Sequence, residues 1–169
     1  MTTPAIYVAC LAAYNSGYLH GKWIDATQGK DAIWEEINAV LESSPIEDAE
    51  EYAIHDYEGF PKSSIGEYTS IDTVVELAEF MDEHGDLGEM VLDHFCGDIE
   101  DAEKAIENYA GEYQSLADFA EEISDGCYNI PEALQYYIDW QSMGRDMEMG
   151  GDIYSIETGY QEVHIFWNH

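Results

Sequence analysis

Negative charge is the feature of this sequence that most limits what the chain can fold into and bind. The 169 residues include 37 Asp plus Glu but only 5 Lys plus Arg, so the formal net charge is −32. A surface of this kind repels nucleic acids and anionic membranes, and direct binding to either is excluded. It attracts a strongly basic surface or a cation. Because 46% of the residues are hydrophobic, the chain can still build a core, and wholesale disorder is excluded.

The acidic residues are concentrated in the middle of the chain. Residues 47–125 contain 25 acidic side chains and only two basic ones, Lys62 and Lys104. Each like-charge pair at helical spacing costs a few tenths of a kcal/mol. Selection for stability alone therefore does not account for this stretch, and a function of the charge is indicated.

A predicted helix in this stretch shows how the charges are arranged. At about 100° per residue, its acidic residues form one narrow stripe: Asp72, Glu76, Glu79 and Glu83. Asp82 falls outside this stripe, and the apolar residues lie on the opposite side. The stripe advances roughly 5–6 Å per charge, whereas duplex DNA carries one charge per ~3.4 Å of axis on each strand. One such helix is typical of a solvated face, but the same bias in several helices with almost no compensating base favours phosphate mimicry.

The hydrophobic pattern predicts an α+β fold, with mixed strand and helix at both ends of the chain and a helical middle. Strands are predicted at residues 6–12, 18–25 and 52–57, and Asp31 is the predicted cap of a helix between the last two. In the middle, a capping box at Thr69 and Asp72 begins a helix that Gly85 stops. Further helices begin at Asp86 and Asp98, and the last of these is predicted to reach Tyr109.

The last third mixes helices and strands. Ser115 and Asp118 repeat the capping spacing of a helix that ends near Gly126. Pro131 suits the first turn of a helix that runs toward Gly144. Residues 153–156 and 160–167 read as a hairpin around Thr158-Gly159.

Motifs of enzymes and metal sites are missing from the sequence. It contains no G-x-G-x-x-G, P-loop, G-x-S-x-G or H-E-x-x-H pattern, so neither catalytic residues nor a cofactor is predicted. The segment around His84 and Asp86 has the wrong glycine offset for a calcium loop, and no metal site is predicted.

The cysteines, Cys10, Cys96 and Cys127, are widely spaced and odd in number, which is typical of a reduced, cytoplasmic protein with buried thiols. No apolar run reaches 18 residues, and no positively charged leader precedes Lys22.

Several segments together resemble the ArdA family of antirestriction proteins. The opening segments Ile6–Val8, Tyr14–Gly17 and Gly21–Asp25 are similar to the start of that family, and YAIHDYEGF at 52–60 to the end of its first domain. LDHFCGDIEDAEKAIENY, which ends at Tyr109, is similar to the acidic antirestriction motif, although Cys96 stands where a small residue is expected. YYIDWQSMGRD at 136–146 and the aromatic C-terminal hairpin also fit.

This resemblance implies a non-enzymatic protein that mimics bent B-form DNA and occupies the DNA-binding groove of type I restriction–modification enzymes, inhibiting restriction and modification. It implies a homodimer formed through the last of three small domains in a row. We place these domains at residues 1–61 (a three-stranded sheet and a helix), 62–108 (acidic and helical) and 109–169 (α+β, with the dimer contacts). An elongated chain also suits the charge, because 32 charges at one per ~1.7 Å match about 54 Å of duplex, longer than the ~40 Å diameter of a compact chain of this length.

The predicted partner-binding carboxylates, which stand in for phosphates, extend from the predicted stripe through the following helices. They are Asp72, Glu76, Glu79, Glu83, Asp86, Glu89, Asp93, Asp98, Glu100, Asp101, Glu103, Glu107, Glu112, Asp118, Glu121, Glu122 and Asp125. The dense aromatic cluster of Tyr136, Tyr137 and Trp140 is the predicted dimer interface.

Two other functions are compatible with the charge. In a protein adapted to high salt, acidity only maintains solubility, and the low lysine content fits that reading better than the many aromatic residues do. A divalent-cation-binding protein is the other alternative.

Overall fold

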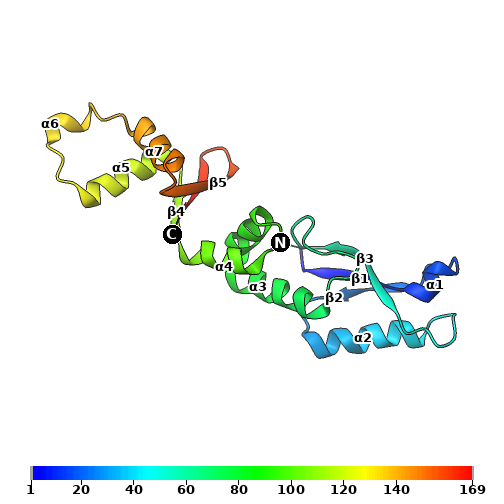
Figure 1. The fold of residues 1–169 in the computed structure, drawn as a ribbon. Helices are drawn as coiled ribbons and strands as arrows, with labels where there is room; N and C mark the ends of the chain where they lie inside the picture. The colour runs from blue at the N-terminus through cyan, green and yellow to red at the C-terminus, as the bar shows by residue number, and fades with distance from the viewer. Residues whose placement is uncertain (1, 169) are drawn as a thin grey trace. The chain divides into compact units, whose positions relative to one another are not determined.

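The fold combines helices with two small sheets. The computed structural model describes residues 2–168, and the chain forms two compact units, Met1–Ala102 and Glu103–His169. Each unit contains a three-stranded antiparallel sheet (Figure 1). The mixed α/β class predicted from the sequence is therefore confirmed. The three-domain division and the elongated arrangement stay predictions.

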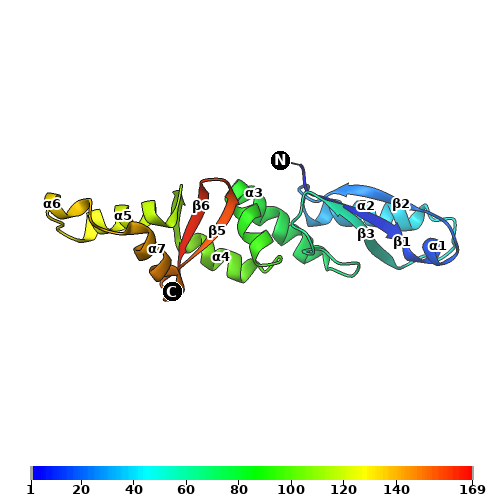
Figure 2. The ribbon, with the colours of Figure 1, turned by 90° about the horizontal axis from the view of Figure 1, so that it is seen from above.

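The first unit is built on a sheet with the order β2-β1-β3. Its strands are β1 (Ala5–Cys10), β2 (Gly21–Asp25) and β3 (Tyr52–Glu58). Helix α2 (Lys30–Glu42) lies along one face of this sheet (Figures 1 and 2) and buries Ile33, Ile37 and Val40, which are spaced four and three residues apart. This spacing is why the sequence predicted the helix.

The predicted boundaries of the first unit need correction at three places. The first strand ends at Cys10 because the next residues form the short helix α1 (Leu11–Asn15). The second strand begins at Gly21, not at residue 18. The cap of α2 is Gly29, whose φ of 96° suits glycine, and Asp31 lies in the first turn.

Helix α3 (Ile71–His94) carries more acidic residues than any other helix of the first unit and bends within its length. Gly85 has non-helical dihedrals, φ 58° and ψ −138°, so two helical segments meet there, as the predicted stop required. The N-cap is Ser70, not Thr69: the Ser70 hydroxyl accepts a hydrogen bond from the Thr73 N–H. The Thr69 hydroxyl instead accepts from the Gly66 N–H at 2.7 Å, which removes it from the helix.

The end of α3 explains why a small residue is expected at position 96, where this sequence has Cys96. Cys96 follows the C-cap Phe95 with φ 55°, and the Gly97 N–H donates to the Leu92 carbonyl oxygen at 2.8 Å. This left-handed position is where a helix end favours glycine, so Cys96 stands in a turn that normally selects a small residue. The Asp98 carboxylate then accepts from the Asp101 N–H and begins α4 (Ile99–Glu107).

The second unit packs two helices on a sheet with the order β4-β6-β5. The strands are β4 (Tyr109–Tyr113), β5 (Ile153–Gly159) and β6 (Glu162–Trp167), and the helices are α5 (Leu116–Cys127), α6 (Glu132–Gln135) and α7 (Trp140–Met149). Phe119 of α5 is fully buried against Ile153, Val163 and Ile165 of the sheet. Gly144 lets α7 approach α5 closely, because a Cβ there would lie 2.6 Å from the Leu116 carbonyl oxygen.

Three predictions for the C-terminal third are corrected. Tyr109 begins β4 and does not end a helix. The hairpin turn lies at Tyr160-Gln161, two residues later than predicted, and Gln161 has φ 58°. The predicted helix from Pro131 to Gly144 is interrupted, because the Asp139 carboxylate accepts from the Ser142 N–H and caps a new helix there.

Candidate partner-binding surface

The first segment of α3 separates its acidic face from its buried face. Val74, Leu77, Ala78 and Met81 are buried, as the helical period predicted. The four stripe carboxylates are exposed: Asp72, Glu76, Glu79 and Glu83. The apolar side of α3 therefore holds the helix in the fold while the acidic side stays in solvent.

One end of this stripe is ion-paired. The Lys30 Nζ of α2 lies 2.5 Å from the Asp72 Oδ1, and this contact raises the pKa of Lys30. No local sequence pattern indicates this pair, because the two residues come from different helices far apart in the chain. Lys30 therefore partly neutralises the charge of Asp72. Glu76 and Glu79 have no basic partner within residues 2–168.

The acidic surface continues through the rest of α3 and through α4. All the predicted carboxylates of these segments are exposed except Glu89, which is half-buried. The exposed ones are Asp86, Asp93, Asp98, Glu100, Asp101, Glu103 and Glu107. On α4 the buried residues Ala102 and Ala105 mark the opposite side.

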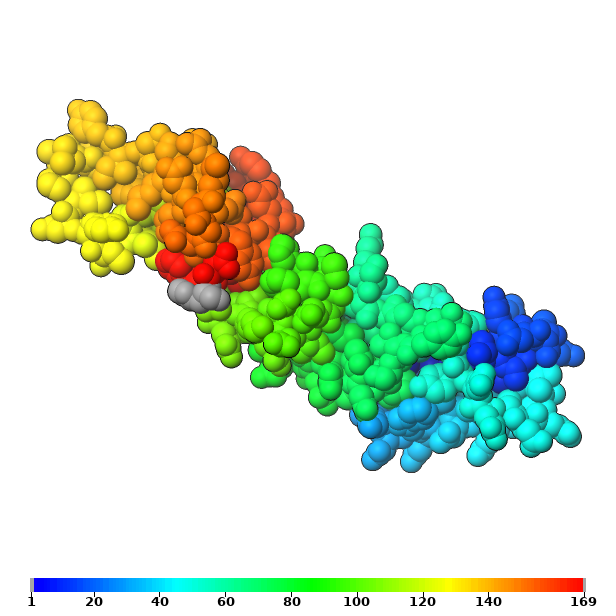
Figure 3. Space-filling view, viewed as in Figure 1, coloured from blue at the N-terminus to red at the C-terminus, as the bar shows by residue number. Residues whose placement is uncertain are grey.

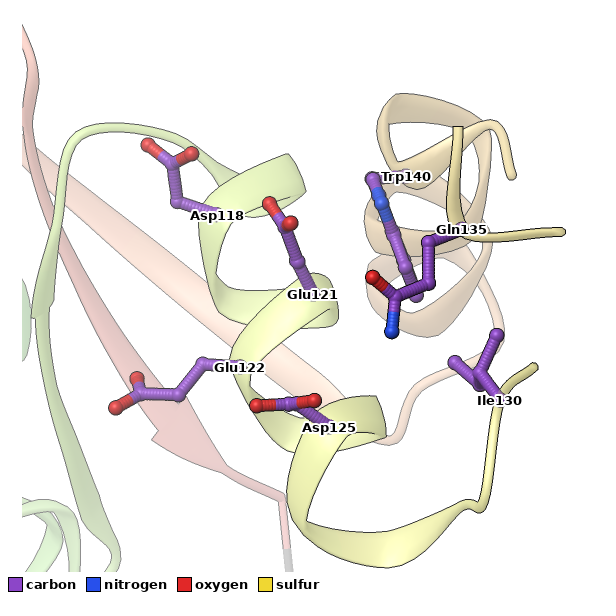
Figure 4. Close-up of a pocket in the computed structure, with 7 residues that line it drawn as sticks. All are labelled: Asp118, Glu121, Glu122, Asp125, Ile130, Gln135 and Trp140. Carbon is purple, nitrogen blue, oxygen red and sulfur yellow. The ribbon is translucent and has the colours of Figure 1, made fainter. Parts of the chain in front are cut away.

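In the second unit, the acidic residues project from α5. Ser115 caps this helix by accepting from the Asp118 N–H, as its spacing predicted. Asp118, Glu121, Glu122 and Asp125 are exposed, as is Glu112 on β4. The four carboxylates of α5 line a hollow of about 380 Å³ together with Ile130, Gln135 and Trp140 (Figure 4). Ile130 and Gln135 were not predicted as part of any site.

Glu122 has a specific partner within its own unit. Its carboxylate accepts a hydrogen bond from the Tyr113 hydroxyl, and this contact, with partial burial, raises the pKa of Tyr113 to about 12. In Figure 4 the Glu122 side chain points away from Trp140 and Gln135. Glu122 is thus partly engaged in the fold, whereas Glu121 and Asp125 have no such partner among the described residues.

The predicted dimer residues lie in two different environments. Tyr136 and Tyr137, which follow α6, are 93% and 85% exposed. Trp140 is half-buried and faces the acidic hollow (Figure 4). The surface around α6, yellow in Figure 3, also exposes Tyr128 and Leu134. An unpartnered surface of this kind is typical of an interaction site, and the dimer interface stays a prediction.

Other possible sites are not supported by the geometry. Among residues 2–168, no group of three or more His, Cys, Asp or Glu side chains is placed to hold a metal ion. Only Cys10 is buried, so the expectation of buried thiols is wrong for Cys96 and Cys127, which lie exposed at the ends of α3 and α5. Within the same described range, no helix is long and apolar enough to cross a membrane.

A comparison with known protein families identifies the family of this chain. A family model described as antirestriction protein (ArdA) matches residues 6–162, nearly the whole chain. The chain belongs to the ArdA family. No curated protein matches it significantly. The resemblance read from the sequence is therefore confirmed, and the chain is an antirestriction protein of a family that interacts with restriction–modification enzymes.

Proposed function

We propose that this ArdA-family chain mimics B-form DNA and competes with it for the DNA-binding groove of type I restriction–modification enzymes. Its carboxylates replace the phosphates that meet Arg and Lys in that groove. Both restriction and modification depend on this groove and are inhibited. The main support is that α3, α4 and α5 each expose several carboxylates, of which Glu76 and Glu79 have no basic partner within residues 2–168.

Binding alone is sufficient for this function. The proposed inhibitor needs neither turnover nor a cofactor, so it is not an enzyme. It acts in the cytoplasm, as a homodimer formed through its C-terminal domain, with contacts at Tyr136, Tyr137 and Trp140. The arrangement as three small domains in an elongated row belongs to the same proposal.

A competition titration tests the mechanism. Increasing amounts of the protein are added to a purified type I methyltransferase bound to labelled target DNA. We expect full, reversible displacement of the DNA. Because contacts to phosphates carry no base code, enzymes that recognise different target sequences should be inhibited alike. Inhibition of cleavage without displacement of DNA would rule out mimicry and indicate contact with another part of the enzyme.

A further inference from the structure

The bend of α3 divides its acidic surface into two segments at a single glycine. Glu79 and Glu83 precede Gly85, and Asp86, Glu89 and Asp93 follow it. Gly85 has φ 58° and ψ −138°. L-residues avoid this combination, which lies outside their left-handed helical region. A Cβ at this position would nevertheless meet no atom within 4 Å, so only the backbone conformation requires glycine.

A second glycine allows the two segments to pack closely. A Cβ on Gly88 would lie 2.7 Å from the His84 Cβ and 3.3 Å from the Phe80 carbonyl oxygen. On a straight helix, Gly88 would be displaced about 12 Å along the axis from Phe80. The chain therefore turns sharply at Gly85, as the change of direction of α3 in Figure 1 illustrates.

The sequence also suits a straight helix, so the bend is not imposed by the hydrophobic pattern. On an uninterrupted helix, the buried residues Val74, Met81 and Leu92 would fall within about 20° of one another. The carboxylates would not remain aligned. Asp86, Glu89 and Asp93 would be turned away from the stripe that ends at Glu83 by about 80° on average.

We propose that Gly85 is a positioning residue for partner recognition: its backbone conformation sets the direction of the Asp86–Asp93 carboxylates relative to the Asp72–Glu83 stripe, so that both segments fit one DNA-binding groove. This inference rests on the proposed function. It assigns a recognition role to a residue that carries neither charge nor a side chain.

The test compares two alanine stereoisomers at position 85. Gly85→Ala makes the observed dihedrals unfavourable and favours a straight helix. D-alanine at the same position accepts them, because φ 58° and ψ −138° mirror the extended region of L-residues. The D-alanine protein is assembled by joining a synthetic segment that ends at Phe95 to a segment that begins with Cys96. The two proteins have the same composition and charge.

Two readouts separate the bend from recognition. Spin labels on Thr73→Cys and on the exposed Cys96, in a Cys127→Ser background, report the distance across the bend; a straight helix would place these residues roughly 35 Å apart. We expect a shorter distance in the native and D-alanine proteins and a longer one in G85A. In the competition titration, unlabelled G85A should need at least tenfold more protein to displace DNA, and the D-alanine protein should match the native one.

Gly88→Ala is a second variant that opens the bend by steric contact, so the test does not depend on the folding of G85A. It should lengthen the label distance and weaken competition. An unchanged distance in the folded alanine variants would overturn the assignment of the bend to these glycines. A longer distance with native competition would overturn the role in recognition. If the native protein does not displace DNA, the proposed function fails and the recognition role with it, whereas the distances still report what sets the bend.

Discussion

At the scale of single residues, Tyr113 makes the most distinctive electrostatic contact. The Glu122 carboxylate and partial burial raise its pKa to about 12. Because the folded-state pKa lies above the unfolded value of about 10, the contact stabilises the fold fully below pH 10 and is lost as pH rises through about 12. NMR of tyrosine labelled at the ring carbon that bears the hydroxyl should report this titration. Glu122→Ala should move the pKa of Tyr113 back toward 10, because it removes both the acceptor of the Tyr113 hydroxyl and its negative charge, and an unchanged value would contradict the contact.

Also at the residue scale, no single carboxylate should dominate partner binding. An exposed charge pair contributes about 0.2–1 kcal/mol, which corresponds to less than about a sixfold change in affinity. Glu79 is exposed and has no basic partner within residues 2–168, so Glu79→Gln tests this directly. We expect its half-inhibitory concentration in the competition titration to stay within that range. Complete loss of inhibition with an unchanged melting temperature would contradict distributed binding.

At the scale of elements, the stripe on the first segment of α3 should act as a unit. Four charges at 0.2–1 kcal/mol each amount to roughly a 4-fold to several-hundred-fold loss of inhibition. The combined variant D72N/E76Q/E79Q/E83Q should therefore weaken competition far more than Glu79→Gln alone. A matched control neutralises four exposed carboxylates outside the proposed site: Glu47, Asp48, Glu50 and Glu51. An equal loss in the control would mean that only total charge matters.

The caps of α3 and α5 illustrate how far local sequence predicts an element. The spacing of Ser115 and Asp118 predicted the α5 cap because both partners lie within one turn. For α3 the same spacing predicted Thr69, but the Thr69 hydroxyl accepts from the Gly66 N–H and Ser70 caps the helix instead. Ser70→Ala should lower the free energy of unfolding by about 1 kcal/mol, measured by chemical denaturation. Ser16→Ala, at an exposed serine with no side-chain bond within residues 2–168, should change it by less than half as much.

The sequence pattern does not predict elements whose formation depends on residues far away in the chain. The hydrophobic pattern predicts a helix that reaches Tyr109. Strand β4 forms there instead, because β6 supplies its hydrogen bonds from more than fifty residues away. The helical pattern from Pro131 toward Gly144 does not predict the break between α6 and α7, which forms because the Asp139 carboxylate caps α7. The exposed carboxylates were predictable because they alternate with buried apolar residues. The ion pair of Lys30 with Asp72 was not, because tertiary packing creates it.

At the scale of the whole molecule, a functional acidic surface and simple adaptation to salt predict different responses to ionic strength. A net charge of −32 creates self-repulsion that extends over a Debye length of ~30 Å at 0.01 M salt and ~8 Å at 0.15 M. The melting temperature of the free protein should therefore rise with salt over this range. Attraction to a basic groove is screened by the same ions, so inhibition should weaken over the same range, mainly through slower association. A protein whose acidity only maintains solubility would show the first response without the second. Melting curves and competition titrations between 0.01 and 0.3 M salt measure both, and a melting temperature that stays flat or falls with salt would mean that bound cations already neutralise the surface.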